Sequence, residues 1–66
     1  MKGKVKWYNH MKGFGFIHGD DGNDFFVHRT AIPADISLYE EDLVEFDMEK
    51  TEQGLKAVNI KKLKNT

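Results

Sequence analysis

The sequence contains no cysteine, which excludes disulfide frameworks, thiolate zinc sites and cysteine nucleophiles. It also lacks long apolar runs: lysines interrupt every short apolar stretch near its start, so neither a signal peptide nor a membrane-spanning segment is expected. Both absences fit a cytoplasmic protein. With 66 residues the chain can bury one core only, so we expect a single, marginally stable domain over residues 1–66.

Strong net charge is also missing. The formal net charge is −1, so the overall positive charge that draws many proteins to nucleic acid is absent. The charges are nevertheless unevenly distributed: no acidic residue precedes Asp20, and no basic residue lies between Asp35 and Glu49. This pattern predicts one positive and one negative patch. Either patch could simply be a solvated face, so charge alone does not identify a partner.

Turn residues divide most of the chain into short β-type segments without a helical period, a pattern typical of a small barrel or sandwich. The sequence GDDGN at 19–23 favours a tight reversal between two of these segments. Residues 64–66 are expected to be a frayed tail. Five strands are predicted: residues 2–8, 13–18 and 24–28, one from 43 to the polar loop 51–54, and one over 55–63.

The segment before the fourth strand carries mixed signals. Pro33 breaks regular structure, whereas Ser37–Glu40 matches a helix capping box, so a loop with at most one helical turn is predicted. Strict alternation follows in the fourth strand, and its predicted inner side consists of Val44, Phe46 and Met48. In the last strand, alternation separates two pairs of residues: Val58 and Ile60 on one side, Asn59 and Lys61 on the other.

Alternation in the second and third strands produces two apolar faces. A half-buried antiparallel sheet needs only one of them for a core, and the first face supplies it with Ile17, Phe25 and Val27. The second face is therefore expected on the surface, where soluble monomers rarely keep such a patch without a use. Nucleobases are one use, because each has a flat π-face. This surface face holds Phe14, Phe16, Phe26 and His28.

These segments resemble the cold-shock domain family, including its two ribonucleoprotein motifs. The similarity covers nearly the whole chain: GKVKWYN at 3–9, KGFGFI at 12–17, DFFVH at 24–28, Ala31-Ile32, and Gly54, Ala57, Asn59 and Ile60 in the closing strand. The resemblance implies an all-β, five-stranded antiparallel Greek-key barrel of the OB-fold type that binds single strands by stacking. The RNA-recognition domain also contains such a motif, but it requires two helices, which the pattern of this sequence does not predict.

The resemblance also implies which residues contact nucleic acid. Alternation places Trp7 on the core side with Val5, so the first strand must bulge or twist to expose this ring. Arg29 stands where many members carry an aromatic ring; it could stack on a base and bind phosphate, or pair with an acid at the surface. The loop at 33–36 offers no aromatic, unlike many members. The implied contacts besides Arg29 are Lys6, Trp7, Lys12, Phe14, Phe16, Phe26 and His28, flanked by Lys4 and Asn9.

Two other functions are compatible with the composition. The acidic stretch from 40 to 49 could bind a protein. A metal or acid–base site could use His10, His18, His28, Asp20, Asp21 and Asp24. Their spacing fits no recognised metal site, and a calcium loop starting at Asp20 would need an acid where Ala31 stands. We therefore expect a monomeric, non-enzymatic binder of single-stranded RNA or DNA that acts as an RNA chaperone without metal or cofactor.

Overall fold

The computed structural model describes residues 1–63, and the tail expected at 64–66 lies outside this range. Within it the chain forms five strands and one short 3₁₀ turn, η1. No helix among these residues is long and apolar enough to cross a membrane. The elements are β1 (Lys2–Asn9), β2 (Phe14–Gly19), β3 (Asp24–His28), η1 (Arg29–Ala31), β4 (Leu43–Thr51) and β5 (Gly54–Lys62).

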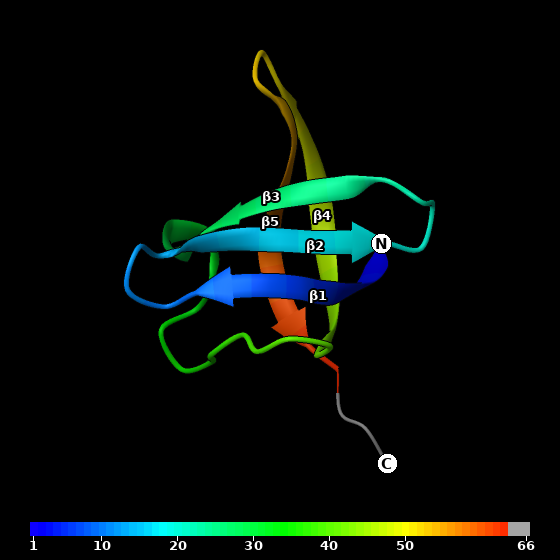
Figure 1. The fold of residues 1–66 in the computed structure, drawn as a ribbon. Helices are drawn as coiled ribbons and strands as arrows, with labels where there is room; N and C mark the ends of the chain where they lie inside the picture. The colour runs from blue at the N-terminus through cyan, green and yellow to red at the C-terminus, as the bar shows by residue number, and fades with distance from the viewer. Residues whose placement is uncertain (64–66) are drawn as a thin grey trace.

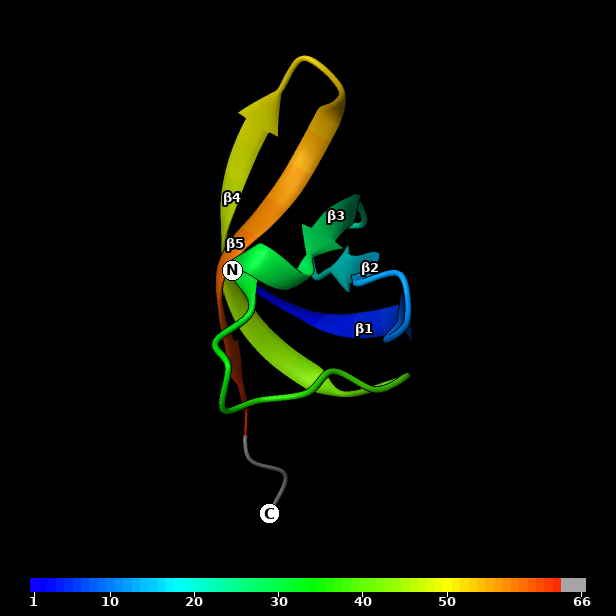
Figure 2. The same cartoon turned by 90° about the vertical axis from the view of Figure 1, so that its left-hand side faces the viewer.

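The strands close into a barrel in the order β1-β2-β3-β5-β4, which confirms the predicted fold (Figure 1). Four neighbouring pairs are antiparallel, whereas β3 and β5 pair in parallel through Phe26 and Lys56. An odd number of strands cannot close with every pair antiparallel, so one parallel pair is unavoidable. Figure 2 shows that the β4–β5 hairpin extends well beyond the three shorter strands.

The core confirms the predicted inner face of the second and third strands. Nine side chains are at most 1% exposed: Val5, Ile17, Phe25, Val27, Leu38, Val44, Phe46, Ala57 and Ile60. Leu38 was not predicted; it enters the core from the loop between η1 and β4. The end of that loop is held against β1, because Val5 N–H donates to the Asp42 carbonyl at 2.8 Å and Glu41 N–H donates to the Val5 carbonyl at 2.7 Å.

Two predictions from strand alternation are wrong. Met48 is 52% exposed, although its partner in β5, Ala57, is buried. The pairing of β3 with β5 is at Phe26 and Lys56, next to Ala57, and the β4–β5 hairpin extends past the three shorter strands (Figure 2), so the larger Met48 side chain lies at the edge of the core. Val58 does not share a side with Ile60: Ala57 and Ile60 are buried and Val58 is only partly buried. The cause is an extra residue in β5, where Asn59 adopts a left-handed φ of 54° and the register with β4 shifts.

The predicted irregularity at Trp7 is confirmed. Val5 lies opposite Ile17 and Trp7 lies opposite Phe16, so β1 contains one more residue than β2 over this stretch. The bulge turns Trp7 outward, and the residue is 36% exposed. The helical turn, by contrast, forms at Arg29–Ala31 and not within the capping-box pattern at 37–40, where Tyr39 N–H bonds to the Asp42 carboxylate instead at 3.0 Å.

Candidate nucleic-acid interface

Five aromatic side chains form one continuous cluster on the outer side of β1, β2 and β3, here called the aromatic surface. Its members are Trp7, Phe14, Phe16, Phe26 and His28. The strand register produces this arrangement, because it places side chains of the same parity next to one another across the sheet. One row runs from Trp7 through Phe16 to Phe26, and a second places Phe14 opposite His28.

The rings support one another at distances typical of aromatic pairs. Trp7 lies 5.8 Å from Phe14 and 5.6 Å from Phe16, measured between ring centroids. Phe26 is stacked on Phe14 at 5.9 Å and meets Phe16 edge-on at 5.8 Å. This mutual contact leaves the three phenylalanines half-buried and outside the core, so their predicted outward orientation is confirmed. The cluster is therefore held in place before any ligand arrives.

His28 is oriented by its own backbone. Its Nδ1 accepts a hydrogen bond from Thr30 N–H at 3.3 Å and lies 3.0 Å from the Thr30 hydroxyl, so the side chain caps η1. An Nδ1 that accepts leaves the hydrogen of a neutral ring on Nε2. The ring plane is within 28° of that of Phe26, at 6.4 Å. His28 therefore extends the aromatic surface and also offers a hydrogen-bond donor.

The predicted lysines and Asn9 are placed differently from one another. Lys6 is paired with Asp24, with Nζ 3.1 Å from Oδ2, so it borders the aromatic surface with its charge already partnered. Asn9 uses its side-chain oxygen to hold the β1–β2 turn, accepting from the N–H groups of Met11 and Lys12 at 3.0 Å each. Lys4 and Lys12 are exposed, the first further back along β1 and the second in that turn.

Arg29 lies beside the aromatic surface. Its N–H donates to the Gly13 carbonyl at 2.8 Å, and its side chain crosses that glycine so closely that a Cβ on Gly13 would lie 2.8 Å from Arg29 Cδ. The guanidinium borders a small pocket of about 240 Å³ that Tyr8 and His10 also line. Within residues 1–63 Arg29 forms no ion pair, so the surface pairing considered from the sequence is not observed.

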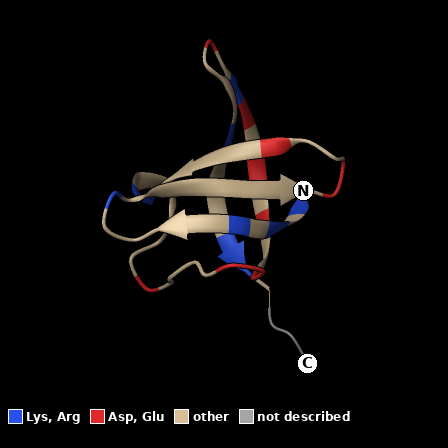
Figure 3. Ribbon diagram, in the orientation of Figure 1, with Lys and Arg blue, Asp and Glu red and all other residues tan. Residues whose placement is uncertain are grey.

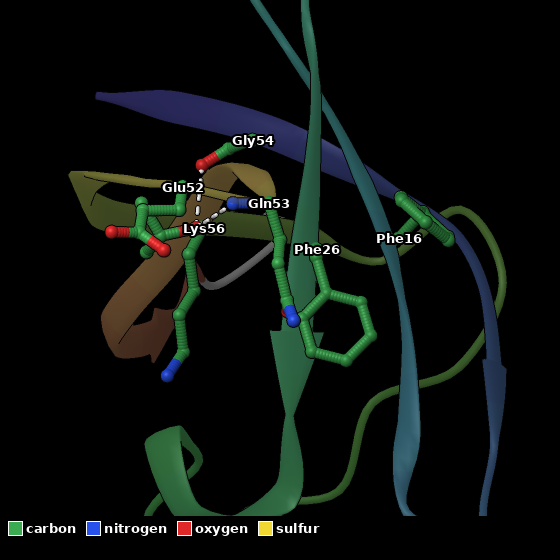
Figure 4. Close-up of a pocket in the computed structure, with 7 residues that line it drawn as sticks. Phe16, Phe26, Glu52, Gln53, Gly54 and Lys56 are labelled. Carbon is green, nitrogen blue, oxygen red and sulfur yellow. Dashed lines mark hydrogen bonds between the residues drawn. The ribbon is translucent and has the colours of Figure 1, made fainter.

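A groove adjoins the aromatic surface on the side of the β4–β5 hairpin. It has a volume of about 510 Å³ and lies between the rings of Phe16 and Phe26 and the hairpin residues Thr51–Gly54 and Lys56 (Figure 4). Lys56 extends the row of Trp7, Phe16 and Phe26, because it pairs with Phe26 in the parallel closure. Lys56 was not predicted from the sequence as part of the site, since only this long-range pairing brings it there.

The charge pattern agrees with the sequence prediction in part. Figure 3 shows acidic residues along β4 and in the loop before it. The acidic run is partly neutralised by the neighbouring strand, since Glu45 faces Lys61 and Glu49 faces Lys56 in the β4–β5 register. Lys62 also lies 3.1 Å from the Asp42 carboxylate. The negative patch is therefore weaker than the sequence alone indicates.

Of the histidines and aspartates that could have formed a metal site, His18 and Asp24 contact each other at 2.9 Å, but no third member joins them within residues 1–63. Nowhere in the part of the chain that the structure describes do three or more His, Cys, Asp or Glu side chains gather in a way that could hold a metal ion. Asp21 instead accepts from Asn23 through its backbone and side-chain amides at 3.1 and 3.0 Å, which stabilises the β2–β3 turn. This segment is structured as a polar turn.

Comparison with known proteins gives matches over nearly the whole chain. A family model described as the 'Cold-shock' DNA-binding domain matches residues 1–63. The cold shock-like protein CspC of Bacillus cereus is 51% identical over 65 residues, which span 96% of this chain and all of the relative. The cold shock protein CspC of Bacillus subtilis is 48% identical, covering 92% of this chain and 96% of its own length. The cold shock-like protein of Thermotoga maritima is 43% identical with the same coverage.

A solved structure has a similar fold. Drosophila Unr CSD456 superposes with a TM-score of 0.72 and 27% sequence identity over 96% of this chain. The match spans only 26% of that longer chain.

Proposed function

The chain belongs to the cold-shock domain family, and on that premise we propose that it binds single-stranded RNA or DNA by stacking bases on the aromatic surface. By holding bases unpaired it acts as an RNA chaperone, without requiring a particular sequence. The observation that carries the proposal is the continuous cluster of five rings across β1–β3. Binding of this kind involves no covalent step and no cofactor.

Stacking explains both the strength and the selectivity that we propose. Each base–ring contact contributes about 1–3 kcal/mol, so three or four rings offer on the order of 3–12 kcal/mol before the cost of ordering the strand. The remainder is enough for micromolar or tighter binding. A ring can reach the face of a base only when that face is not covered by neighbouring pairs. Single strands are therefore bound and duplexes are not.

The bulge in β1 supports this reading of the site. If β1 alternated regularly, Trp7 would point to the same side as Val5 and would enlarge the core. Because of the bulge, Trp7 contacts Phe14 and Phe16 from the outside and widens the platform by one ring. The intrinsic fluorescence of this single tryptophan also makes the site observable. Titration with a short oligonucleotide should quench Trp7 saturably, and an unchanged spectrum would argue against stacking.

Salt should weaken binding only moderately. If Lys4, Lys6, Lys12 and Arg29 each neutralised a phosphate, log affinity against log salt would have a slope near about −3, at roughly −0.7 per contact on single strands. Because Lys6 is already paired with Asp24, we expect a slope no steeper than this value. Stacking on the rings should leave residual binding at high salt. Pyrimidine-rich strands should be preferred, because their bases unstack from one another more easily. Fluorescence titrations across a salt series measure the slope. Complete loss of binding with a steep slope would assign the affinity to charge.

Arg29 is expected to contribute from the edge of the aromatic surface. Replacing it with Phe should preserve or improve affinity, because a ring replaces a guanidinium that can itself stack. Replacing it with Glu should weaken affinity, because the carboxylate repels phosphate. The loss should be at least the value of one exposed charge contact, about 0.2–1 kcal/mol. Both variants can be titrated with the same oligonucleotide. Unchanged affinity of Arg29→Glu would remove this residue from the site.

A further inference from the structure

One charged cluster borders the aromatic surface and consists of Lys6, His18 and Asp24. The Asp24 carboxylate binds a different partner through each oxygen. Oδ2 lies 3.1 Å from Lys6 Nζ, and Oδ1 lies 2.9 Å from His18 Nδ1. All three side chains are exposed, with 55% of Lys6 and 57% of His18 accessible, so solvent protons and phosphates can reach them.

The strands place this cluster where a bound strand would pass. Lys6 immediately precedes Trp7 within the bulge of β1. Asp24 lies opposite His18, one pair along the β2–β3 ladder from Ile17 and Phe25 and two pairs from Phe16 and Phe26. A phosphate that follows a base stacked on Trp7 or Phe16 therefore approaches Lys6, whose charge is cancelled by Asp24 in the free protein.

We propose that Lys6, His18 and Asp24 form a proton-controlled phosphate site at the edge of the aromatic surface, an inference that rests on the proposed function. With a neutral imidazole, His18 donates to Asp24, and the cluster carries no net charge because Lys6 and Asp24 balance. With a protonated imidazole, the cluster carries one positive charge. The stronger hydrogen bond from His18 to Asp24 also weakens the ion pair between Asp24 and Lys6, so Lys6 can bind a phosphate.

The direction of the effect follows from which group changes charge. Histidine is the side chain that ordinarily changes charge between about pH 5 and 8. Asp24 remains ionised throughout this interval, because the hydrogen bond from His18 and, second, that from Lys6 hold the pKa of its carboxyl below the usual value of 3.8. Acidification over this interval therefore adds positive charge without removing negative charge, and single-strand affinity rises. By linkage, strand binding favours proton uptake to the same extent.

The other charged groups around His18 do not change this sign. Lys4 lies opposite His18 on β1, and Asp20 and Asp21 follow in the turn after β2. Side chains of lysine and aspartate do not ordinarily change charge between about pH 5 and 8. His28, a second histidine, lies within the aromatic surface, so its contribution must be separated from that of His18 by mutation.

The test compares single-strand affinity at about pH 5.5 and about pH 8, using a short oligothymidylate and Trp7 fluorescence. Wild type should bind roughly two- to fivefold more tightly at the lower pH, the effect of one exposed charge contact, with a salt slope steeper by about 0.7. His18→Gln keeps a hydrogen-bond donor but cannot be protonated, so it should lose this increment. His18→Lys carries a permanent charge and should bind at about pH 8 as tightly as wild type does at about pH 5.5.

Two further variants complete the test. Asp24→Asn releases Lys6 and should bind roughly two- to fivefold more tightly than wild type at about pH 8. His10→Gln alters a histidine outside the cluster and should keep the full pH effect. The proposal fails if His18→Gln retains the whole increment, which would assign it to His28, or if Asp24→Asn binds less tightly, which would make Asp24 a direct contact. Absence of binding by wild type at both pH values would instead overturn the proposed function.

Discussion

Replacement of Phe26 with alanine is expected to weaken single-strand binding by about 1–3 kcal/mol while the fold survives. Phe26 is the central ring of the aromatic surface, since it contacts Phe14, Phe16 and His28. Its loss removes one stacking platform and leaves the core beneath unchanged, because Phe26 is only half-buried and is not part of it. Phe14→Ala and Phe16→Ala should behave similarly. Trp7 remains in all three variants, so fluorescence titration can measure the affinities.

A matched control is available on β4, outside the aromatic surface. Met48 is also a large apolar side chain, 52% exposed on β4 and outside the aromatic surface. Met48→Ala should therefore leave affinity unchanged, which would separate stacking from a general effect of exposed apolar area. Thermal unfolding of each variant completes the comparison. If Phe26→Ala lost the roughly 3–5 kcal/mol of stability typical of a core phenylalanine, the assignment of faces would be wrong.

The neighbouring substitution, Phe25→Ala, should have the opposite profile. Phe25 is fully buried and packs against Phe46 with ring centroids 5.0 Å apart. Its removal leaves a cavity in the core, and a loss of about 3–5 kcal/mol in the free energy of unfolding is expected. A single core in a chain of this size supplies roughly 3–5 kcal/mol of stability, so the variant should be largely unfolded at room temperature. Circular dichroism without denaturant measures the unfolded fraction of the variant, and urea denaturation of the wild type provides the reference stability.

The adjacency of Phe25 and Phe26 makes the pair informative. The two residues share a strand, a residue type and nearly the same sequence context, and they differ in the face to which they point. Any difference between the two alanine variants therefore reports on the face alone. An osmolyte that restores folding of Phe25→Ala should also restore single-strand binding, because its aromatic surface is intact. Refolded protein that still fails to bind would place Phe25 in the binding site.

The local parts of the fold could be predicted from sequence because they depend on neighbouring residues. Alternation in β2 and β3 identified Ile17, Phe25 and Val27 as core, and the conflict between alternation and an exposed Trp7 indicated the bulge in β1. Alternation failed where regular geometry ends. At Asn59, β5 contains one more residue than the facing stretch of β4. Met48 alternates as a core residue would, but it lies at the edge of the core, 52% exposed opposite the buried Ala57.

The remaining features depend on contacts between distant parts of the chain. Leu38 reaches the core from a loop, and no periodic pattern marks a residue of this kind. Lys56 joins the site only through the parallel pairing of β3 with β5, which closes the barrel. Lys6 could be predicted as a basic residue near the aromatic rings, but its pairing with Asp24 joins residues 18 positions apart. The sequence shows which charged residues are present, but only the folded structure shows which of them form ion pairs.

The central claim is that the aromatic surface binds unpaired bases. A competition experiment tests it most directly: a fluorescently labelled single strand is bound to the protein and displaced with unlabelled single-stranded or double-stranded oligonucleotide of the same sequence. The single strand should displace the label, and the duplex should not do so at comparable concentration, because paired bases cannot stack on the rings. Equal displacement by the duplex, which carries the phosphates of both strands, would show that charge and not the aromatic surface holds the strand.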